Sequence, residues 1–319
     1  MTHDFLDLKI DFMFKQMFGQ PSRKHITLAF INDLLGREGT DKIIDLTFIN
    51  TELVKDKCEG KTSRLDLAVI TESGEHINIE VQVSNQHDMS ERILYYWAKT
   101  YSSLIHSGEN YRQLTPVIFI SILNYALFPS QTDEFHTIFH IREDRENFLW
   151  SEDLEFHVFD LRSFMVKWKK YRREFLKQKR GNAFPWLLMF TATNFDTKEV
   201  NEEIISELEE WAMNIEQVRE ALIEWETLSA NKENRVIFEA RAKELRDLLS
   251  NLEGERRLGR EEGRKEGLDE GIVKGIEQGI VQEKREIAIE MLKEGIPINM
   301  IEKVTKLSLS EIDRLKKPL

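Results

Sequence analysis

Two segments of the chain carry acidic side chains where they could meet on neighbouring β-strands. Residues 64–70 contain Asp66 and residues 76–83 contain Glu80, and both segments are rich in β-branched and apolar residues. The residues between them, Glu-Ser-Gly-Glu, are typical of a tight turn, so the sequence predicts a β-hairpin. Such a hairpin would place the two carboxylates on adjacent strands.

Paired carboxylates of this kind are ligands for a hard divalent cation. Mg²⁺, or Mn²⁺ in its place, takes one or two carboxylates and completes its shell with water and phosphate oxygens. Asp66 and Glu80 would supply the carboxylates, and the backbone carbonyl of Val81 could add a ligand. The ion could generate hydroxide and stabilise charge on a scissile phosphate. Gln82 is uncharged, so it could orient the attacking water or a phosphate but could not act as a general base.

The strand period decides which side chains share a face. Asn78, Glu80 and Gln82 lie on one face of the predicted strand, and apolar residues occupy the other. Because the apolar set must face the core, we expect the polar set to face a cleft or solvent. A solvated strand face without function is the alternative. A two- or four-residue loop would oppose Asp66 to Val81, on the wrong face, so we predict an odd loop or a β-bulge.

The surrounding pattern predicts an α/β fold. Apolar residues recur at helical spacing over residues 4–35, where Pro21 interrupts the pattern and Gly36 ends it. The apolar run at 116–123 is typical of a strand covered on both faces. The order of elements indicates a mixed sheet with flanking helices. Further predicted elements are strands at 43–50, 135–142 and 154–160, an aromatic-rich helix at 88–106, and helices from about 162 to 250.

One basic stretch stands out, from residue 167 to residue 180. It holds a single acidic residue, Glu174. We consider it a candidate for contact with a phosphate backbone, which would make binding dependent on salt concentration. A solvated helix face is the alternative. The candidate DNA-binding residues are Lys167, Lys169, Lys170, Arg172 and Arg173.

The carboxyl-terminal part has a different pattern. Glycine recurs at every fourth position from Gly259 to Gly279, mostly between charged residues. Each glycine inside a helix costs about 1 kcal/mol relative to alanine, so packing against a partner helix or many charge pairs must compensate. A partly frayed linker helix is the alternative. Residues 286–319 resemble a small helix-turn-helix unit, with Gly295 closing a helix and Ser308 or Ser310 capping another.

Composition limits the classes of function. The chain has 319 residues, of which 41% are hydrophobic, and a formal net charge of −12. A global basic field for nucleic acid is therefore absent, although a local patch can suffice. The single cysteine, Cys58, excludes a disulfide framework within the chain and fits a reducing compartment. Neither a membrane span nor a signal peptide is evident, so we expect a cytoplasmic protein without a membrane partner.

Several short motifs, in this order and spacing, resemble one family. The sequence is similar to the PD-(D/E)XK nuclease family transposases, also called Rpn family recombination-promoting nucleases. The resemblance covers the chain to about residue 180, and the glycine-rich tail is similar in style. The motifs are Asp11-Phe-Met-Phe-Lys15-Gln-Met-Phe18, Ser63-Arg64-Leu-Asp66, Ile79-Glu80-Val81-Gln82, Arg92-Ile-Leu-Tyr95-Tyr96-Trp97 and Gly108-Glu-Asn-Tyr111-Arg-Gln-Leu-Thr-Pro116-Val-Ile.

The resemblance implies a restriction-endonuclease-like mixed sheet flanked by helices, with a helical carboxyl-terminal extension. It also implies Mg²⁺-dependent cleavage of DNA phosphodiesters, with the acidic roles on Asp66 and Glu80 and the third motif position at Gln82. The wider superfamily usually has lysine at that position, so the route of water activation is open. Asp11 could contact a metal-bound water and Lys15 a phosphate; a surface pair beside an aromatic packing set is the alternative.

These observations lead to two hypotheses from different classes. The first is a cytoplasmic, metal-dependent DNA endonuclease linked to recombination or transposition, expected as a homodimer and without an organic cofactor. The second is a catalytically impaired DNA-binding or interaction module with a degraded nuclease core. Arg92 could grip a phosphate or form a helix-surface salt bridge. We expect a nuclease-like core at 1–180, a helical extension at 181–250, a glycine-repeat helix or linker at 251–285 and a small tail at 286–319.

Overall fold

The computed structural model describes residues 4–50, 65–175 and 183–316. The chain divides into two compact units, residues 1–247 and residues 248–319. Among the described residues, no helix has both the length and the apolar character required to cross a membrane.

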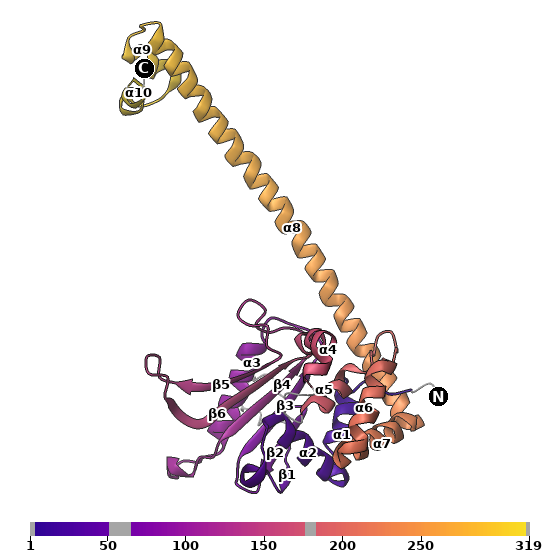
Figure 1. Cartoon of the computed structure of the whole chain (residues 1–319). Coiled ribbons are helices and arrows are strands. Elements are labelled where there is room, and N and C mark those ends of the chain that lie inside the picture. Colours follow the sequence, from indigo (N-terminus) through magenta and orange to yellow (C-terminus); the bar gives the residue numbers. More distant parts are fainter. Residues whose placement is uncertain (1–3, 51–64, 176–182, 317–319) are drawn as a thin grey trace. The chain divides into compact units, whose positions relative to one another are not determined.

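The first unit is built on a six-stranded mixed sheet (Figure 1) with the strand order β1-β2-β3-β4-β6-β5. The strands β3, β4 and β6 run parallel in the middle, and β1, β2 and β5 pair antiparallel outside them. The restriction-endonuclease-like α/β fold is thereby confirmed. The strands are β1 (Leu46–Phe48), β2 (Leu67–Thr71), β3 (His76–Gln82), β4 (Val117–Leu123), β5 (His136–Arg142) and β6 (Leu149–Asp160).

The central strands are covered on both faces. Every residue of β4 is buried, as its uninterrupted apolar sequence predicts. The predicted strands at 135–142 and 154–160 are present, although β6 begins earlier, at Leu149. The edge strand β1 is shorter than the predicted segment 43–50.

Helices surround the sheet in the first unit. The aromatic-rich helix predicted at 88–106 is present as α3, and α8 continues into the second unit. Short 3-10 turns occur at Pro21–Arg23, Gly39–Asp41 and Tyr111–Gln113. The helices are α1 (Asp11–Phe18), α2 (Lys24–Leu35), α3 (Met89–Ser103), α4 (Leu161–Phe175), α5 (Ala183–Thr191), α6 (Glu202–Asn214), α7 (Glu216–Ala230) and α8 (Lys232–Lys293).

The predicted helical segment 4–35 is wrong at its beginning. The residues before Asp11 form a turn in which the Asp7 carboxylate accepts the backbone N–H of Lys9. The Lys9 ammonium donates to the backbone carbonyls of Phe190 (2.7 Å) and Thr193 (3.0 Å), and the turn is buried against that distant segment. Tertiary hydrogen bonds therefore override the helical spacing of the apolar residues here.

An aromatic cluster joins the amino-terminal helices to α5. The rings of Phe18 and Phe30 stack with centroids 4.2 Å apart, and Phe14 and Phe190 pack around them. Trp186 adds an edge-to-face contact with Phe30, and its indole N–H donates to Asp33. This cluster fixes α1 and therefore the position of the Asp11 and Lys15 side chains.

The second unit contains the carboxyl-terminal part of α8, followed by α9 (Ile298–Thr305) and α10 (Leu309–Lys316). A small core around Ala288, Ile301 and Ile312 holds these helices together. Gly295 ends α8 with a φ of 72°, and Ser308 forms a reciprocal capping box with Glu311.

The glycine-repeat segment is helical throughout. Beyond the helix's own backbone, no described atom lies within 4 Å of where a Cβ would stand at Gly259, Gly263, Gly267, Gly271, Gly275 or Gly279. The ion pair between Lys274 and Glu270 is an example of the predicted four-residue charge pairing.

Candidate active site

The β2–β3 hairpin sets the relation between the two acidic residues. Its ladder runs from Leu67 opposite Ile79 to Ile70 opposite His76, and the Thr71 N–H donates to the Glu75 carbonyl. The loop between Thr71 and Glu75 thus has an odd number of residues, as predicted, and Gly74 adopts the required positive φ of 87°. The ladder stops at Leu67, and Asp66, which directly precedes β2, accepts the Val81 N–H with its side chain. A further regular step would oppose Asp66 to Glu80, so their shared face stays a prediction.

Glu80 is a buried carboxylate with one oxygen satisfied and one free. Its side chain is 2% exposed. Oε1 accepts hydrogen bonds from Gln82 Nε2, at 2.8 Å, and from the Arg92 guanidinium of α3. Oε2 has no hydrogen-bond partner among the described residues. A buried carboxylate oxygen without a partner is costly unless a ligand is meant to fill the position.

Asp66 directly precedes β2, and its side chain is 14% exposed. Its Oδ2 accepts the backbone N–H of Val81 at 2.9 Å, and its Oδ1 lies 3.5 Å from the Lys15 ammonium. Burial raises the pKa of the Asp66 carboxyl, while the Val81 N–H and the Lys15 charge act in the opposite direction. The N–H and carbonyl of one strand residue point to the same side, so the Val81 carbonyl also points toward β2.

The first turns of α1 reach the same place. The Lys15 Nζ lies 3.4 Å from Oδ2 of Asp11, on the same helix face, and 3.5 Å from Oδ1 of Asp66, next to the sheet. The structure therefore brings together Asp11, Lys15 and Asp66. The contact of Asp11 with a metal-bound water and the contact of Lys15 with a phosphate stay predictions.

The polar face of β3 does not open onto a cleft or solvent, contrary to expectation. Asn78 and Glu80 are both buried beneath α3. The Asn78 side-chain amide donates to Thr100 Oγ1 at 3.1 Å, and Glu80 contacts Arg92. The helix supplies a polar partner for each residue, and this makes burial of the polar face tolerable. Of the three residues predicted on the polar face, Gln82, at the carboxyl end of the strand, is the one that remains partly exposed.

The donor set fits a small hard cation. Among the described residues there is no cluster of three or more His, Cys, Asp and Glu side chains that could hold a metal ion. Magnesium, however, needs only one or two carboxylates. The unpartnered Oε2 of Glu80 is one carboxylate oxygen of this kind, and Asp66, which bonds to the N–H of the next residue, Val81, is the candidate for the second.

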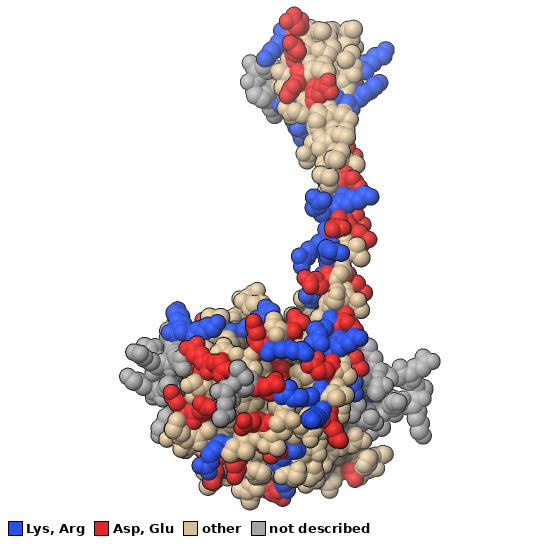
Figure 2. All heavy atoms as spheres, turned by 90° about the vertical axis from the view of Figure 1, so that its right-hand side faces the viewer, with Lys and Arg blue, Asp and Glu red and all other residues tan. Residues whose placement is uncertain are grey.

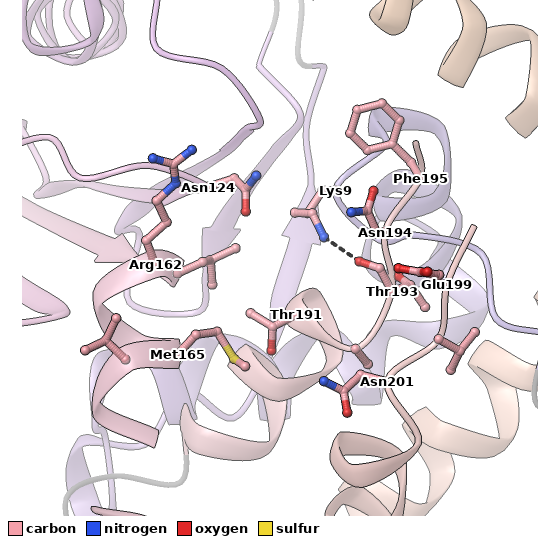
Figure 3. Close-up of a pocket in the computed structure, with 14 residues that line it drawn as sticks. Lys9, Asn124, Arg162, Met165, Thr191, Thr193, Asn194, Phe195, Glu199 and Asn201 are labelled. Atoms are coloured by element: carbon pink, nitrogen blue, oxygen red, sulfur yellow. Dashed lines mark hydrogen bonds between the residues drawn. The ribbon is translucent and has the colours of Figure 1, made fainter. Parts of the chain in front are cut away.

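A cavity of about 880 Å³ lies at the carboxyl-terminal edge of the parallel strands, and sequence reasoning missed it. Asn124 directly follows β4, and its N–H donates to the Gln82 carbonyl at 2.9 Å. Arg162 is the second residue of α4, two positions after the end of β6. Figure 3 shows both residues on one side of the cavity and Thr193 on the other. The available signal was their position immediately after parallel strands, where α/β folds bind ligands.

The basic residues of α4 are not equivalent. Lys167 forms an ion pair with Glu134 at 2.9 Å, whereas Lys169 and Lys170 are exposed. The side chains of Arg172 and Arg173 and all of residues 176–182 lie outside the described residues. On the face seen in Figure 2, basic and acidic side chains are interspersed. The proposed phosphate contacts of α4 stay a prediction.

Comparison with known families agrees with this arrangement. A model of the PD-(D/E)XK nuclease family transposases matches residues 8–255, which is most of the chain. The chain belongs to this family. No curated protein and no solved structure matches it. Membership in the PD-(D/E)XK family supports a nuclease-like role, and nucleases of this family generally use divalent metal ions.

Proposed function

We propose that the protein is a Mg²⁺-dependent DNA endonuclease that hydrolyses phosphodiester bonds in recombination or transposition. The observation that carries this proposal is the buried Glu80 carboxylate, whose Oε2 has no partner among the described residues. Asp66 bonds to the N–H of the next residue, Val81, and this contact supports the pairing of the two acids. Family membership supports the same reaction class. We expect the enzyme to act in the cytoplasm as a homodimer, so that two sites can cut two strands.

Each residue of the site has a role in this proposal. Asp66, Glu80 and the Val81 carbonyl would hold Mg²⁺, or Mn²⁺ in its place. When bound, the ion supplies Lewis-acid stabilisation of phosphate charge and a more acidic water. The Gln82 amide, which now donates to Glu80, can orient a water but cannot take its proton.

Two cations near the carboxylates complete the proposal. Lys15 is 3.5 Å from Asp66, so its charge favours the ionised carboxylate that a metal ion requires. It can also donate to a phosphate oxygen. Arg92 balances the charge of the buried Glu80 carboxylate. Once a metal ion balances that charge instead, Arg92 can donate hydrogen bonds to a phosphate.

A plasmid nicking assay with the purified full-length chain tests the function. We expect Mg²⁺-dependent nicking that falls at least about a hundredfold in Asp66→Asn and Glu80→Gln, the order of loss for central catalytic groups. Asp144→Asn is the matched control, because Asp144 is exposed in the β5–β6 turn at the opposite edge of the sheet. Equal nicking by the wild type and both site variants would disprove the assignment.

The second candidate function is a catalytically impaired DNA-binding module. Gln82 favours it, because no ammonium group stands at the third motif position. Arg92 favours it as well, since an internal cation already contacts Glu80. DNA binding without nicking, at any concentration of Mg²⁺ or Mn²⁺, would support this alternative over the endonuclease.

A further inference from the structure

The cavity at the carboxyl ends of β4 and β6 has features of a built binding site. It is lined by polar groups from four different segments and by the apolar side chains of Met165 and Phe195. Thr193 is 6% exposed, and its hydroxyl has no hydrogen-bond partner among the described residues. A buried hydroxyl in this state is rare unless a water or ligand completes it.

Two further groups at the cavity are free to bind a ligand. Within the described residues, neither the Arg162 guanidinium nor the Asn124 side-chain amide has a hydrogen bond or ion pair. Lys9 also lines the cavity, but its ammonium already contacts Asp7 and two backbone carbonyls. Arg162 therefore carries the available positive charge.

The cavity is adjacent to the proposed catalytic groups along one sheet edge. Gln82 pairs with Leu123 at the ends of β3 and β4, and Leu123 pairs with Asp160 at the end of β6. Asn124 directly follows Leu123, and Arg162 lies two residues after Asp160, so the cavity begins one strand away from Gln82. Lys169 lies seven residues after Arg162, on nearly the same face of α4, and it is exposed.

We propose that this cavity holds one unpaired nucleotide of the DNA strand whose neighbouring phosphodiester lies between Asp66 and Glu80. This inference rests on the proposed nuclease function and adds to it a preference for single-stranded or locally unpaired DNA. Arg162 and Asn124 bind the phosphate of the nucleotide. The Thr193 hydroxyl, whose oxygen is buried in the free chain, rotates toward the cavity and forms a hydrogen bond with the base.

The lining distinguishes a nucleotide from a phosphate ion or a paired duplex. Arg162 is the one lining cation without an ion pair among the described residues, and the lining also contains one carboxylate, Glu199. Such a lining suits at most a single phosphate, held on the Arg162 side, whereas duplex binding relies on many cations along a surface. The neutral amides and hydroxyl suit the edge of a base, and Met165 and Phe195 suit its face. Only an unstacked base can enter a concave site, as in enzymes that read an extruded base.

Binding measurements in the absence of divalent metal test this inference independently of cleavage. The probes are a fluorescent oligo-dT, an abasic oligomer of the same length and a fully paired hairpin duplex, and the readout is anisotropy with the full chain. Arg162→Gln should weaken binding of both single strands about tenfold, the factor equivalent to 1.4 kcal/mol. It should also lower the salt slope by about 0.7. The hairpin duplex should bind equally well to both proteins.

The base contact has its own variant. Thr193→Val should weaken oligo-dT binding about fivefold and leave the abasic oligomer unaffected, because only the base loses a partner. Thr193→Ser, which keeps the hydroxyl, should retain the affinity. Arg112→Gln is the control, since Arg112 is exposed in the turn before β4, at the opposite edge.

The outcomes separate this inference from the proposed function. An effect of Arg162→Gln no larger than that of Arg112→Gln would overturn the nucleotide site and leave the nuclease assignment intact. Equal losses for oligo-dT and the abasic oligomer in Thr193→Val would overturn the base contact. Weakened single-strand binding in Arg162→Gln, together with no Asp66-dependent nicking, would keep the site and refute the nuclease. Because Arg162 is exposed, its replacement leaves the fold intact, and melting curves verify this.

Discussion

The contact between Arg92 and Glu80 allows a quantitative test of the site. Arg92→Gln would leave a carboxylate that is 2% exposed without its cation. Removing one partner of a buried ion pair destabilises a protein by about 3–5 kcal/mol. Because the Arg92 side chain is itself 24% exposed, water can partly solvate the vacated position, and we expect a loss near about 3 kcal/mol.

A double-mutant cycle isolates this pair from the rest of α3. Glu80→Gln removes the charge, so adding Arg92→Gln to it should cost little, and the coupling energy should reach about 2 kcal/mol. Urea unfolding monitored by tryptophan fluorescence measures all four proteins. Arg112→Gln, an exposed arginine, controls for the loss of one positive charge. Additive losses, or a loss in Arg92→Gln below about 1 kcal/mol, would refute the reasoning.

The same variant also reports on metal binding. If Glu80 is a metal ligand, Mn²⁺ should stabilise Arg92→Gln more than the wild type, because the ion replaces the missing cation. At a concentration about a hundred times its dissociation constant, a ligand adds about 2.7 kcal/mol. No stabilisation of Arg92→Gln by Mn²⁺ would count against Glu80 as a ligand.

Three further predictions follow from single residues. Burial raises the pKa of Asp66, so the native state binds this proton more tightly than the unfolded chain. The stability that comes from the protonated Asp66 carboxyl is lost as pH rises through the raised pKa. At pH 7, Asp66→Asn should therefore have a higher melting temperature than the wild type. Calorimetry should show this difference becoming smaller as the pH is lowered. Gly267→Ala should raise helix stability, measured by circular dichroism, by about 1 kcal/mol, because nothing in the described chain contacts this position; a loss would indicate a partner helix. Trp225→Phe should cost about 2 kcal/mol in urea unfolding, because the buried carbonyl of Leu6 would lose its indole donor; an unchanged midpoint would contradict this.

The parity of the hairpin could be predicted from sequence because it is a local property. The strand period assigns each side chain to a face, and the requirement that Asp66 and Glu80 share a face demands an odd loop. The ladder from Leu67 to Ile70 confirms the odd loop, whereas the shared face of Asp66 and Glu80 stays a prediction because Asp66 lies outside the ladder. The burial of strand β4 could be predicted from sequence as well, since its uninterrupted apolar sequence leaves no polar face for solvent.

The cover over the polar face of β3 could not be predicted in this way. It depends on where α3 lies, and the deciding hydrogen bond joins residues 22 positions apart, Asn78 and Thr100. The prediction of a helix around Lys9 was wrong for the same reason, because the hydrogen-bond partners of Lys9, Phe190 and Thr193, lie far along the chain. Periodicity records which residues prefer burial but does not record which distant polar group satisfies them.

The position of Arg92 connects the fold to the proposed chemistry. A carboxylate as buried as Glu80 requires a nearby positive charge, and in the folded chain the α3 guanidinium supplies it. The same guanidinium leaves Oε2 unpaired, so the pair is electrically balanced but its hydrogen bonding is incomplete. A divalent ion between Glu80 and Asp66 would complete that oxygen and add charge next to Arg92. The arginine should then be repelled toward an anion, and the nearest anion in the proposed complex is the DNA phosphate. Metal binding and phosphate binding would therefore be coupled through one side chain, and each should strengthen the other.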